Sequence, residues 1–352
     1  MKTFVPVVII LFSSFCQASA DTTVNGYLDV QAQAGHGLIE VQDNVFLQGE
    51  PGLSFSVYQG AFEFQHRHGQ HRMHIDIPFH QTRTNPENNN NLDLATERAQ
   101  AYISSHVGSD WEWTVGQFDT LWGYEGNDTN TIHYRNLGIV YNVTPNTNTG
   151  FLLTRIYSHR YKASLFLGNS NQTGKQSIQK ELEQGVQLQY KEDNMFAKVG
   201  VLFNQRKGKY SVNGRLYEYE QGALVDVQWG LEDVFALNAI YVHPDNRKVL
   251  HEGQTADTKG TYGVMFDLPL FDMDQGSWAI RLEWLRNDRT NSYMSGYSGN
   301  DSELSKTSLG YKTQIDEFLS LKATADYFTL NVGENGRDNQ WLEGAIAAIY
   351  EF

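Results

Sequence analysis

The chain has 352 residues, of which 40% are hydrophobic, and it carries 27 basic against 41 acidic residues, a formal net charge of −14. An acidic chain has no basic field that could bind phosphates, so we exclude nucleic-acid binding. The mean hydropathy of −0.48 excludes a bundle of membrane helices, and the 13% aromatic content argues against disorder. A large all-β protein with one polar side to each strand fits all of these values.

Residues 1–20 have the three parts of a cleaved signal peptide. Lys2 supplies a positive start, Phe4 to Phe12 form an apolar stretch, and Ala18-Ser19-Ala20 is a small-residue cleavage site. The apolar stretch is too short to span a bilayer, which disfavours an N-terminal anchor. The only cysteine, Cys16, lies in this segment, so the expected mature chain, 21–352, has no disulfide and no helix-length apolar run.

The mature chain alternates between apolar and polar residues along most of its length. Residues 278–284 read W-A-I-R-L-E-W, with the two tryptophans, isoleucine and leucine on one face and arginine and glutamate on the other. A period of two with one polar face predicts strands that are wet on one side. In chain order we expect strands over 24–34, 51–65, 71–81, 96–107, 111–122, 147–157, 162–168, 184–191, 196–206, 217–229, 234–243, 260–270, 277–287, 306–316, 318–330 and 340–352.

The connectors between these segments alternate in length. Short turns such as 108–110 and 191–194 alternate with long polar loops such as 83–94, 123–146 and 288–304. About 16 strands of roughly ten residues have the length that a tilted strand needs to cross hydrocarbon, and only a closed sheet satisfies its backbone there. We therefore predict a single transmembrane antiparallel β-barrel of about 16 strands, with long extracellular loops and short periplasmic turns.

Aromatic residues mark the ends of the predicted strands. Tryptophans lie beside short turns and beside long loops, as in the two aromatic girdles of an outer-membrane barrel, although aromatics can also mark strand ends in a soluble β protein. These girdle candidates are Trp111, Trp229 and Trp278, and Trp122 and Trp341. The chain ends on an alternating segment with Tyr350 and Phe352, which resembles the signal by which the barrel-assembly machinery recognises its precursors.

Three places depart from simple alternation. Pro78 and Pro269 fall inside predicted strands, where proline lacks a ladder donor, so both segments are expected to hold a bulge. Strict alternation would also turn Asp119 towards lipid. A bulge at Gly116–Gln117 would return Asp119 to the lumen and send Phe118 outward.

Residues 116–125 read GQFDTLWGYE, and a polar loop leads to TPNTNTGFLLTRIYS at 144–158. This pattern resembles the motif of the OmpL-like β-barrel porin family of bacterial outer membranes, and the motif-bearing similarity covers residues 96–157. The resemblance implies an outer-membrane barrel that acts as a pore, and it implies no catalytic residue. The cluster of histidines in 66–80 is not a feature of that resemblance.

A pore needs a polar lumen and a constriction. The inward faces of the predicted strands supply charged candidates for the pore lining, namely Arg72, Asp76, Arg98, Arg281, Glu283, Lys322 and Asp326. The segment 123–146 is the candidate constriction loop, with Glu125 and Asp128 on it and Asp119 at its base. Acids there facing arginines on the wall would create a transverse field; the alternative is an external, solvated loop.

Other chemistry finds little support in the sequence. Histidines between His66 and His80 share a strand face, but there is no HExxH motif or cysteine partner, so we expect no metal and no other cofactor. No GxSxG elbow occurs, so we expect no enzyme. We predict a porin for passive diffusion of ions and small hydrophilic solutes, embedded in the outer-membrane bilayer. The sequence shows no interface and leaves the oligomeric state open, with a homotrimer as the candidate that general porins suggest. The alternatives are a non-conducting structural or adhesive barrel and, less favoured, a barrel enzyme such as a lipase.

Overall fold

The computed structural model describes most of residues 21–352. The segments left out are 1–20, 36–38, 43–44, 49–51, 84–89, 96–97, 126–131, 135–137, 142–143, 172–181, 205–207, 213–214, 220–221, 244–247, 250–260, 274–275, 288–301 and 333–338. The expected signal peptide and the candidate Asp128 lie outside the described residues.

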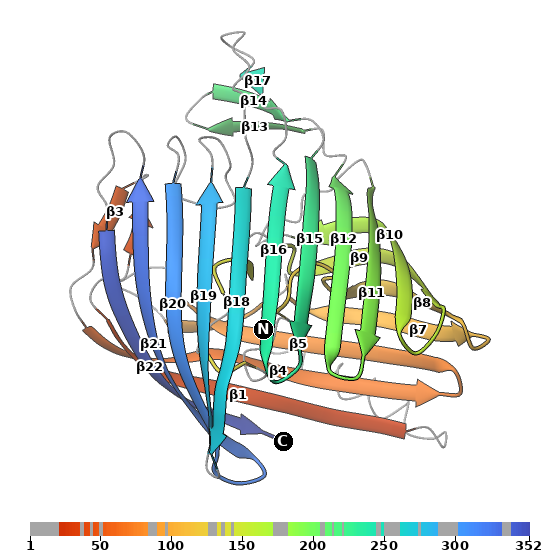
Figure 1. Ribbon diagram of the computed structural model, residues 1–352, viewed down its shortest axis with the longest axis horizontal. Helices are drawn as coiled ribbons and strands as arrows, with labels where there is room; N and C mark the ends of the chain where they lie inside the picture. The colour runs from red at the N-terminus through yellow and green to blue at the C-terminus, as the bar shows by residue number, and fades with distance from the viewer. Residues whose placement is uncertain are drawn as a thin grey trace, which may run out of the picture.

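One large antiparallel sheet closes on itself into a barrel (Figure 1). Each wall strand pairs with the next along the chain, and β22 pairs with β1 to complete the ring. Its strands are β1 (Asp21–Gly35), β4 (Gly52–His68), β5 (His71–Arg83), β6 (Asn90–Leu94), β7 (Gln100–Val107), β8 (Trp111–Asp119), β9 (Thr147–Ile156), β10 (Tyr161–Asn171), β11 (Glu183–Glu192), β12 (Met195–Asn204), β15 (Gly222–Leu231), β16 (Phe235–His243), β18 (Thr261–Met273), β19 (Gly276–Asn287), β20 (Ser302–Gln314), β21 (Leu319–Val332) and β22 (Asn339–Glu351).

The 17 strands of this sheet fill 16 places in the wall, because β6 and β7 both pair with β5. The predicted fold class is therefore confirmed, and each of the expected strands overlaps one place in the wall. One boundary differs: the expected strand 217–229 begins at Gly222, because 215–219 belongs to a separate hairpin. Among the described residues there is no helix that could cross a bilayer.

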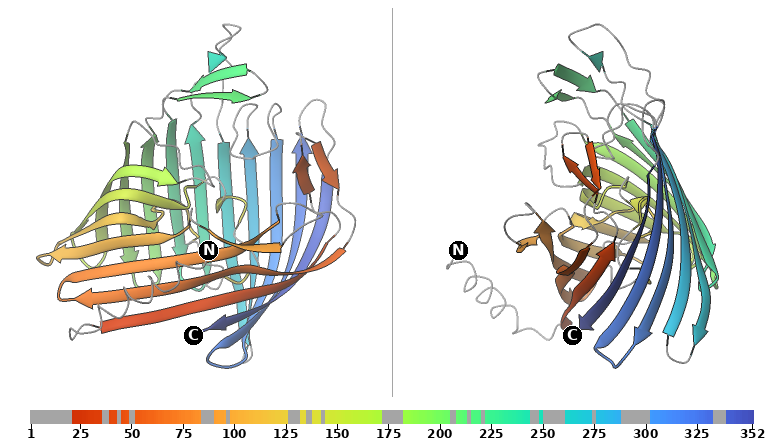
Figure 2. Two further views of the ribbon diagram at one scale, coloured as in Figure 1. Left: turned by 180° about the vertical axis from the view of Figure 1, so that it is seen from behind. Right: turned by 90° about the vertical axis from the view of Figure 1, so that its left-hand side faces the viewer.

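Small sheets stand on the long-loop end of the barrel (Figures 1 and 2). The hairpin of β2 (Ile39–Gln42) and β3 (Val45–Gln48) lies between β1 and β4. A second hairpin, β13 (Gly208–Val212) and β14 (Arg215–Tyr219), pairs with β17 (Lys248–Val249). Figure 1 shows the strands from β11 to β21 running steeply, while β1, β4 and β5 cross behind them at a large angle.

The alternation of the sequence sets the two faces of the wall. Large hydrophobic side chains such as Leu165, Leu188 and Ile346 are exposed on the outside, while polar side chains of the same strands, such as Gln187, point inward and are buried. This is the arrangement that a barrel surrounded by lipid requires.

The two prolines are accommodated in different ways. At Pro269 the register of β18 against β19 shifts before Phe271, so the bulge expected there is confirmed. At Pro78 the strand β5 has no register shift against β4. Instead the neighbouring strand is interrupted between β6 and β7, where the Ala95 amide donates to the Pro78 carbonyl at 2.9 Å. Because the N–H and C=O of one residue point to the same side of a strand, the missing donor of Pro78 faces this interruption.

Candidate functional site in the lumen

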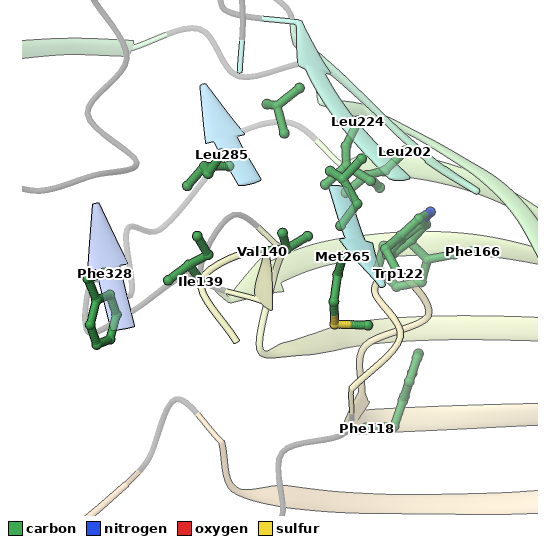
Figure 3. Close-up of a cluster of buried hydrophobic side chains, with 12 residues drawn as sticks. Phe118, Trp122, Ile139, Val140, Phe166, Leu202, Leu224, Met265, Leu285 and Phe328 are labelled. Carbon is green, nitrogen blue, oxygen red and sulfur yellow. The ribbon is translucent and has the colours of Figure 1, made fainter. Parts of the chain in front are cut away.

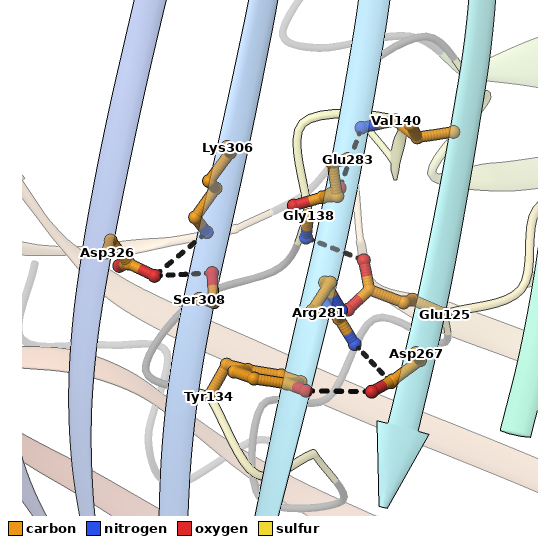
Figure 4. A network of polar contacts seen from close by, with 10 residues as sticks. All are labelled: Glu125, Tyr134, Gly138, Val140, Asp267, Arg281, Glu283, Lys306, Ser308 and Asp326. Atoms are coloured by element: carbon orange, nitrogen blue, oxygen red, sulfur yellow. Dashed lines mark hydrogen bonds and ion pairs between the residues drawn. The ribbon is translucent and has the colours of Figure 1, made fainter. Parts of the chain in front are cut away.

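The connection from β8 to β9, residues 120–146, contacts the inner face of the wall (Figure 4). Its base is held by three hydrogen bonds to strands β11 and β15. The Gln187 side chain donates to the Leu121 carbonyl, the Gly123 amide donates to Asp226 Oδ2 at 3.1 Å, and Gln228 Nε2 donates to the Gly123 carbonyl at 2.7 Å. The loop therefore leaves the end of β8 and bonds to wall strands on the inside of the barrel.

Trp122 fixes the start of this loop by packing its indole against two glycines of the wall. A Cβ atom on Gly185 would lie 2.4 Å from Trp122 Cζ2, and one on Gly200 would lie 3.0 Å from the indole. The indole also meets the ring of Phe166 edge-on, with centroids 5.7 Å apart. Trp122 has no exposed surface, so the side chain fills a space that the bare backbone of β11 and β12 leaves open.

An apolar cluster, here called the lumen cluster, surrounds Trp122 (Figure 3). Its members come from the loop and from the inner faces of wall strands: Phe118, Trp122, Ile139, Val140, Phe166, Leu202, Leu224, Ile240, Val242, Met265, Leu285 and Phe328. The loop is thus packed against the wall like part of a hydrophobic core, and its insertion removes apolar surface from water.

A buried ion-pair network holds the middle of the loop (Figure 4). The Arg281 guanidinium of β19 donates to Glu125 of the loop and, at 2.9 Å, to Asp267 Oδ2 of β18. The Tyr134 hydroxyl donates to the other oxygen of Asp267 at 2.7 Å, and the Tyr134 ring lies 4.2 Å from the guanidinium carbon. Wall arginine and loop carboxylate are therefore in direct contact, and their charges compensate each other.

Further carboxylates bond to the loop and to the neighbouring wall. Glu125 Oε2 accepts from the Gly138 amide at 2.6 Å, and Glu283 Oε1 accepts from the Val140 amide at 3.2 Å. On the adjoining strands Lys306 lies 3.5 Å from Asp326. The Glu283 bond ties the loop to β19, the Glu125 bond joins two parts of the loop, and the Lys306 pair joins β20 to β21.

The tyrosine of the network remains a hydrogen-bond donor over a wide range of pH. Burial, and next the Asp267 carboxylate, raise the pKa of Tyr134 above its ordinary value. Burial likewise raises the pKa of Tyr124, whose ring stacks on Phe196, to about 12. Neither phenol ionises near neutral pH, so the bond from Tyr134 to Asp267 persists there.

The structure corrects the placement of residues at the start of the loop. The pairing of β8 with β7 and with β9 shows no register shift, so the bulge expected at Gly116–Gln117 is wrong. Phe118 belongs to the lumen cluster and not to the outer face, and the Asp119 amide, at the end of β8, donates to Gln100 Oε1 at 3.1 Å. The expectation assumed a wet lumen at every level, whereas the inserted loop makes this level apolar.

The other charged candidates lie on inner faces of the wall. Asp76, Lys322 and Asp326 are all buried there, as are Arg281 and Glu283. Arg72 is half-buried, and its guanidinium donates to Gln65 Oε1 at 2.7 Å. Arg98 lies in the interruption between β6 and β7, where its amide donates to the Ala95 carbonyl at 2.9 Å.

The five girdle tryptophans divide into two groups. Trp111 and Trp229 are exposed on the outside near short turns, and Trp278 lies on the same outer face, packed beside Tyr311. Trp122 is wholly buried in the lumen cluster. Trp341 lies at the edge of this cluster and stacks on Phe328, with ring centroids 4.7 Å apart. Trp122 and Trp341 are therefore not girdle residues, because the inserted loop provides an apolar environment inside the barrel.

The sequence analysis did not identify the lumen cluster, nor Asp267 as a partner of Arg281 and Tyr134. A signal for the cluster exists, because the polar face of several strands turns apolar towards the long-loop end. In β19, for example, the inner face reads Arg281, Glu283, Leu285. Among the described residues no three His, Cys, Asp or Glu side chains lie close enough to hold a metal.

Solved structures similar to this fold are outer-membrane barrels. The outer-membrane channel DcaP of Acinetobacter baumannii has a TM-score of 0.61 at 11% identity, with 96% of this chain and 98% of that chain covered. A loop-deletion mutant of OmpT, an outer-membrane protein of Vibrio cholerae, has a TM-score of 0.58 at 10% identity, with 95% and 100% covered. A trimer form of OmpT has a TM-score of 0.52 at 10% identity, with 94% and 99% covered. These likenesses establish the fold.

The sequence comparisons establish the family. No curated protein matches the sequence. A family model described as "Putative beta-barrel porin-2, OmpL-like" matches residues 21–352, which is the whole chain after the expected signal peptide. The chain is an outer-membrane β-barrel, and it belongs to the OmpL-like family of β-barrel porins.

Proposed function

We propose that this barrel is a narrow channel for passive diffusion of ions and small hydrophilic solutes, and that it performs no catalysis. The observation that carries the proposal is the loop of residues 120–146 bonded to the inner wall of a barrel with 16 wall positions. A barrel of this size is wide enough to leave an aqueous passage, and a loop bonded to its inner wall narrows that passage. Membership of a porin family supports the same reading.

The site also indicates how the passage is narrowed. Glu125 and Arg281 form a closed pair with side chains almost wholly buried, so they contribute rigidity more than a field across open water. The lumen cluster blocks the space behind them. We therefore infer a small conductance, set by the bore beside the loop, with selection by size and by the charges that remain exposed to water.

Export and assembly follow from the same proposal. Removal of residues 1–20 during export would leave a chain that begins at β1, and the terminal segment with Tyr350 and Phe352 would be recognised by the barrel-assembly machinery. A homotrimer is the assembly we propose, supported by a trimer form of the structurally similar OmpT.

Planar-bilayer recording tests the channel. Purified wild-type protein should give small stepwise conductances. A variant with two glycines in place of residues 126–137 should give larger steps, because the Gly138 amide lies only 2.6 Å from Glu125 Oε2 and a short link can join these ends. Removing residues 172–181, between β10 and β11, is the matched control and should leave the steps unchanged.

The second candidate function is a non-conducting structural barrel. The burial of nearly all inward charged side chains around the loop favours it, because a filled lumen carries no current. Wild-type protein that inserts into bilayers without any conductance step would contradict the channel and support this candidate.

A further inference from the structure

A cavity opens at the short-turn end of the lumen. It encloses about 520 Å³ and is formed by the ends of β1, β4, β5 and β7, the turn between β20 and β21, and the C-terminal residues. Here it is called the vestibule. This volume lies in the range of small-molecule sites in proteins.

A cross-strand row of four polar residues forms the inner wall of the vestibule. In the sheet register Asn25 lies opposite Glu63, Glu63 opposite Asp76, and Asp76 opposite Gln100. Directly opposed residues share a face, so two carboxylates stand side by side between two carboxamides.

The rest of the lining adds negative charge. Glu351, which lies opposite Tyr27, and Glu317 of the turn also line the vestibule. Among the described residues that line it, none is lysine or arginine. The nearby Arg72 donates to Gln65, which in turn donates to Glu63.

His74 supplies a second sign of a ligand. Its side chain is about nine-tenths buried, lines the vestibule, and stacks on Tyr102 with ring centroids 4.8 Å apart. Its Nδ1 lies 3.3 Å from Glu63 Oε1 but makes no hydrogen bond there. A neutral imidazole has one N–H donor and one acceptor nitrogen, so its acceptor nitrogen and the carboxylate can together accept from a ligand that brings N–H donors.

We propose that the vestibule binds a primary alkylammonium group and makes the channel prefer cations. The proposal rests on the channel function proposed above and names its class of solute. An ammonium has three N–H donors for the carboxylates, the Gln100 carboxamide and the imidazole, while Tyr27 and Ala61 offer apolar surface for the carbon chain. No three acidic or histidine side chains among the described residues have the spacing for a metal, so an organic cation fits the lining better.

Binding to the folded protein in detergent tests the proposal without any need for conduction. Calorimetry with butylammonium should show saturable binding, which butanol, of the same length without the charge, should not show. The variant Glu63→Gln with Asp76→Asn should weaken butylammonium binding at least about tenfold. Glu232→Gln is the control, because Glu232 is an exposed turn residue bonded to Lys191 at 2.7 Å, and it should bind as the wild type does.

Bilayer recording in a potassium chloride gradient completes the test. Wild-type channels should pass potassium in preference to chloride, and the double variant should lose most of this preference. No butylammonium binding by the wild type, unaltered binding by the double variant, or equal binding of butanol would overturn the vestibule proposal even in a conducting channel. If the wild type showed no conductance but bound butylammonium, and the double variant bound it less, the channel function would be overturned and the ammonium site would remain supported.

Discussion

Arg281 shows how single residues decide the state of the loop. Its guanidinium is buried between Glu125 and Asp267, with Glu283 two residues further on the same inner face. A buried charge that loses its partner costs far more than an exposed pair contributes. The loop therefore depends on this arginine more than on any surface contact.

Arg281→Met should lower the stability of the barrel by about 3–5 kcal/mol, because it leaves buried carboxylates without a counter-charge. The double variant Arg281→Met with Glu125→Gln should lose less than the two single variants added together. Urea unfolding in detergent, followed by tryptophan fluorescence, measures both.

Arg160→Met is the matched control for this prediction. Arg160 pairs with Glu192 at 2.7 Å in an exposed turn, where such a pair contributes about 0–1 kcal/mol. If Arg281→Met proved as mild as Arg160→Met, the network would not hold the loop.

Two kinds of contact fix the position of the loop between β8 and β9, so it behaves as a structural element in its own right. Hydrogen bonds to Gln187, Asp226 and Gln228 set the course of its backbone, and the indole of Trp122 fills the space over two glycines. Contacts of both kinds come from strands distant in sequence. The loop is therefore part of the packed interior and not an appendage of β8.

Gly185→Val should displace the base of this loop, because even a Cβ would lie 2.4 Å from Trp122 Cζ2. With the indole displaced from the glycines, the loop should narrow the passage less. Single-channel conductance should therefore rise and fluctuate more. Gly344→Val is the control, since a Cβ there would have its nearest heavy atom at 3.8 Å. Unchanged conductance in Gly185→Val, with the barrel folded, would mean that the loop does not limit the passage.

At the scale of the whole molecule, the barrel depends on the seam between its last and first strands. The Phe352 amide donates to the Gly26 carbonyl at 3.0 Å, and the Gly26 amide donates back at 2.9 Å. The Phe352 ring lies against Gly26 and meets Phe62 edge-on, with centroids 5.9 Å apart. The terminal residue thus closes the ring with backbone and side chain together.

Removing Phe352 should reduce the yield of folded barrel and lower its unfolding temperature, because the seam loses two hydrogen bonds and an aromatic contact. The intensity of the folded band on gels of unheated samples measures the yield, and the loss of this band after heating to increasing temperatures measures the unfolding temperature. Leu342→Ala, on the outer face of the same strand, removes apolar surface without touching the seam and should have the smaller effect. If both changes lowered the yield and the unfolding temperature equally, the contacts of Phe352 at the seam would contribute no more than ordinary apolar surface.

The sequence by itself determined the strands and their faces. Alternation in segments such as 278–284 is a local property, and a period of two tells which residues share a face whatever lies beyond. The number of strands followed from the turns between them, and closure followed from the need to satisfy every backbone group in lipid. The same reasoning found Glu125 and Arg281 as inner charges.

Only the tertiary structure decided which inner residues meet water. Glu125 and Arg281 lie 156 residues apart, and no local pattern shows that they form a pair. The sequence predicts Phe118 outside because of an expected bulge, and Trp122 and Trp341 outside because they lie beside long loops, as girdle residues do. The inserted loop creates an apolar interior at that level, and the burial of a side chain depends on everything packed against it, which the residue's own neighbours in sequence do not reveal.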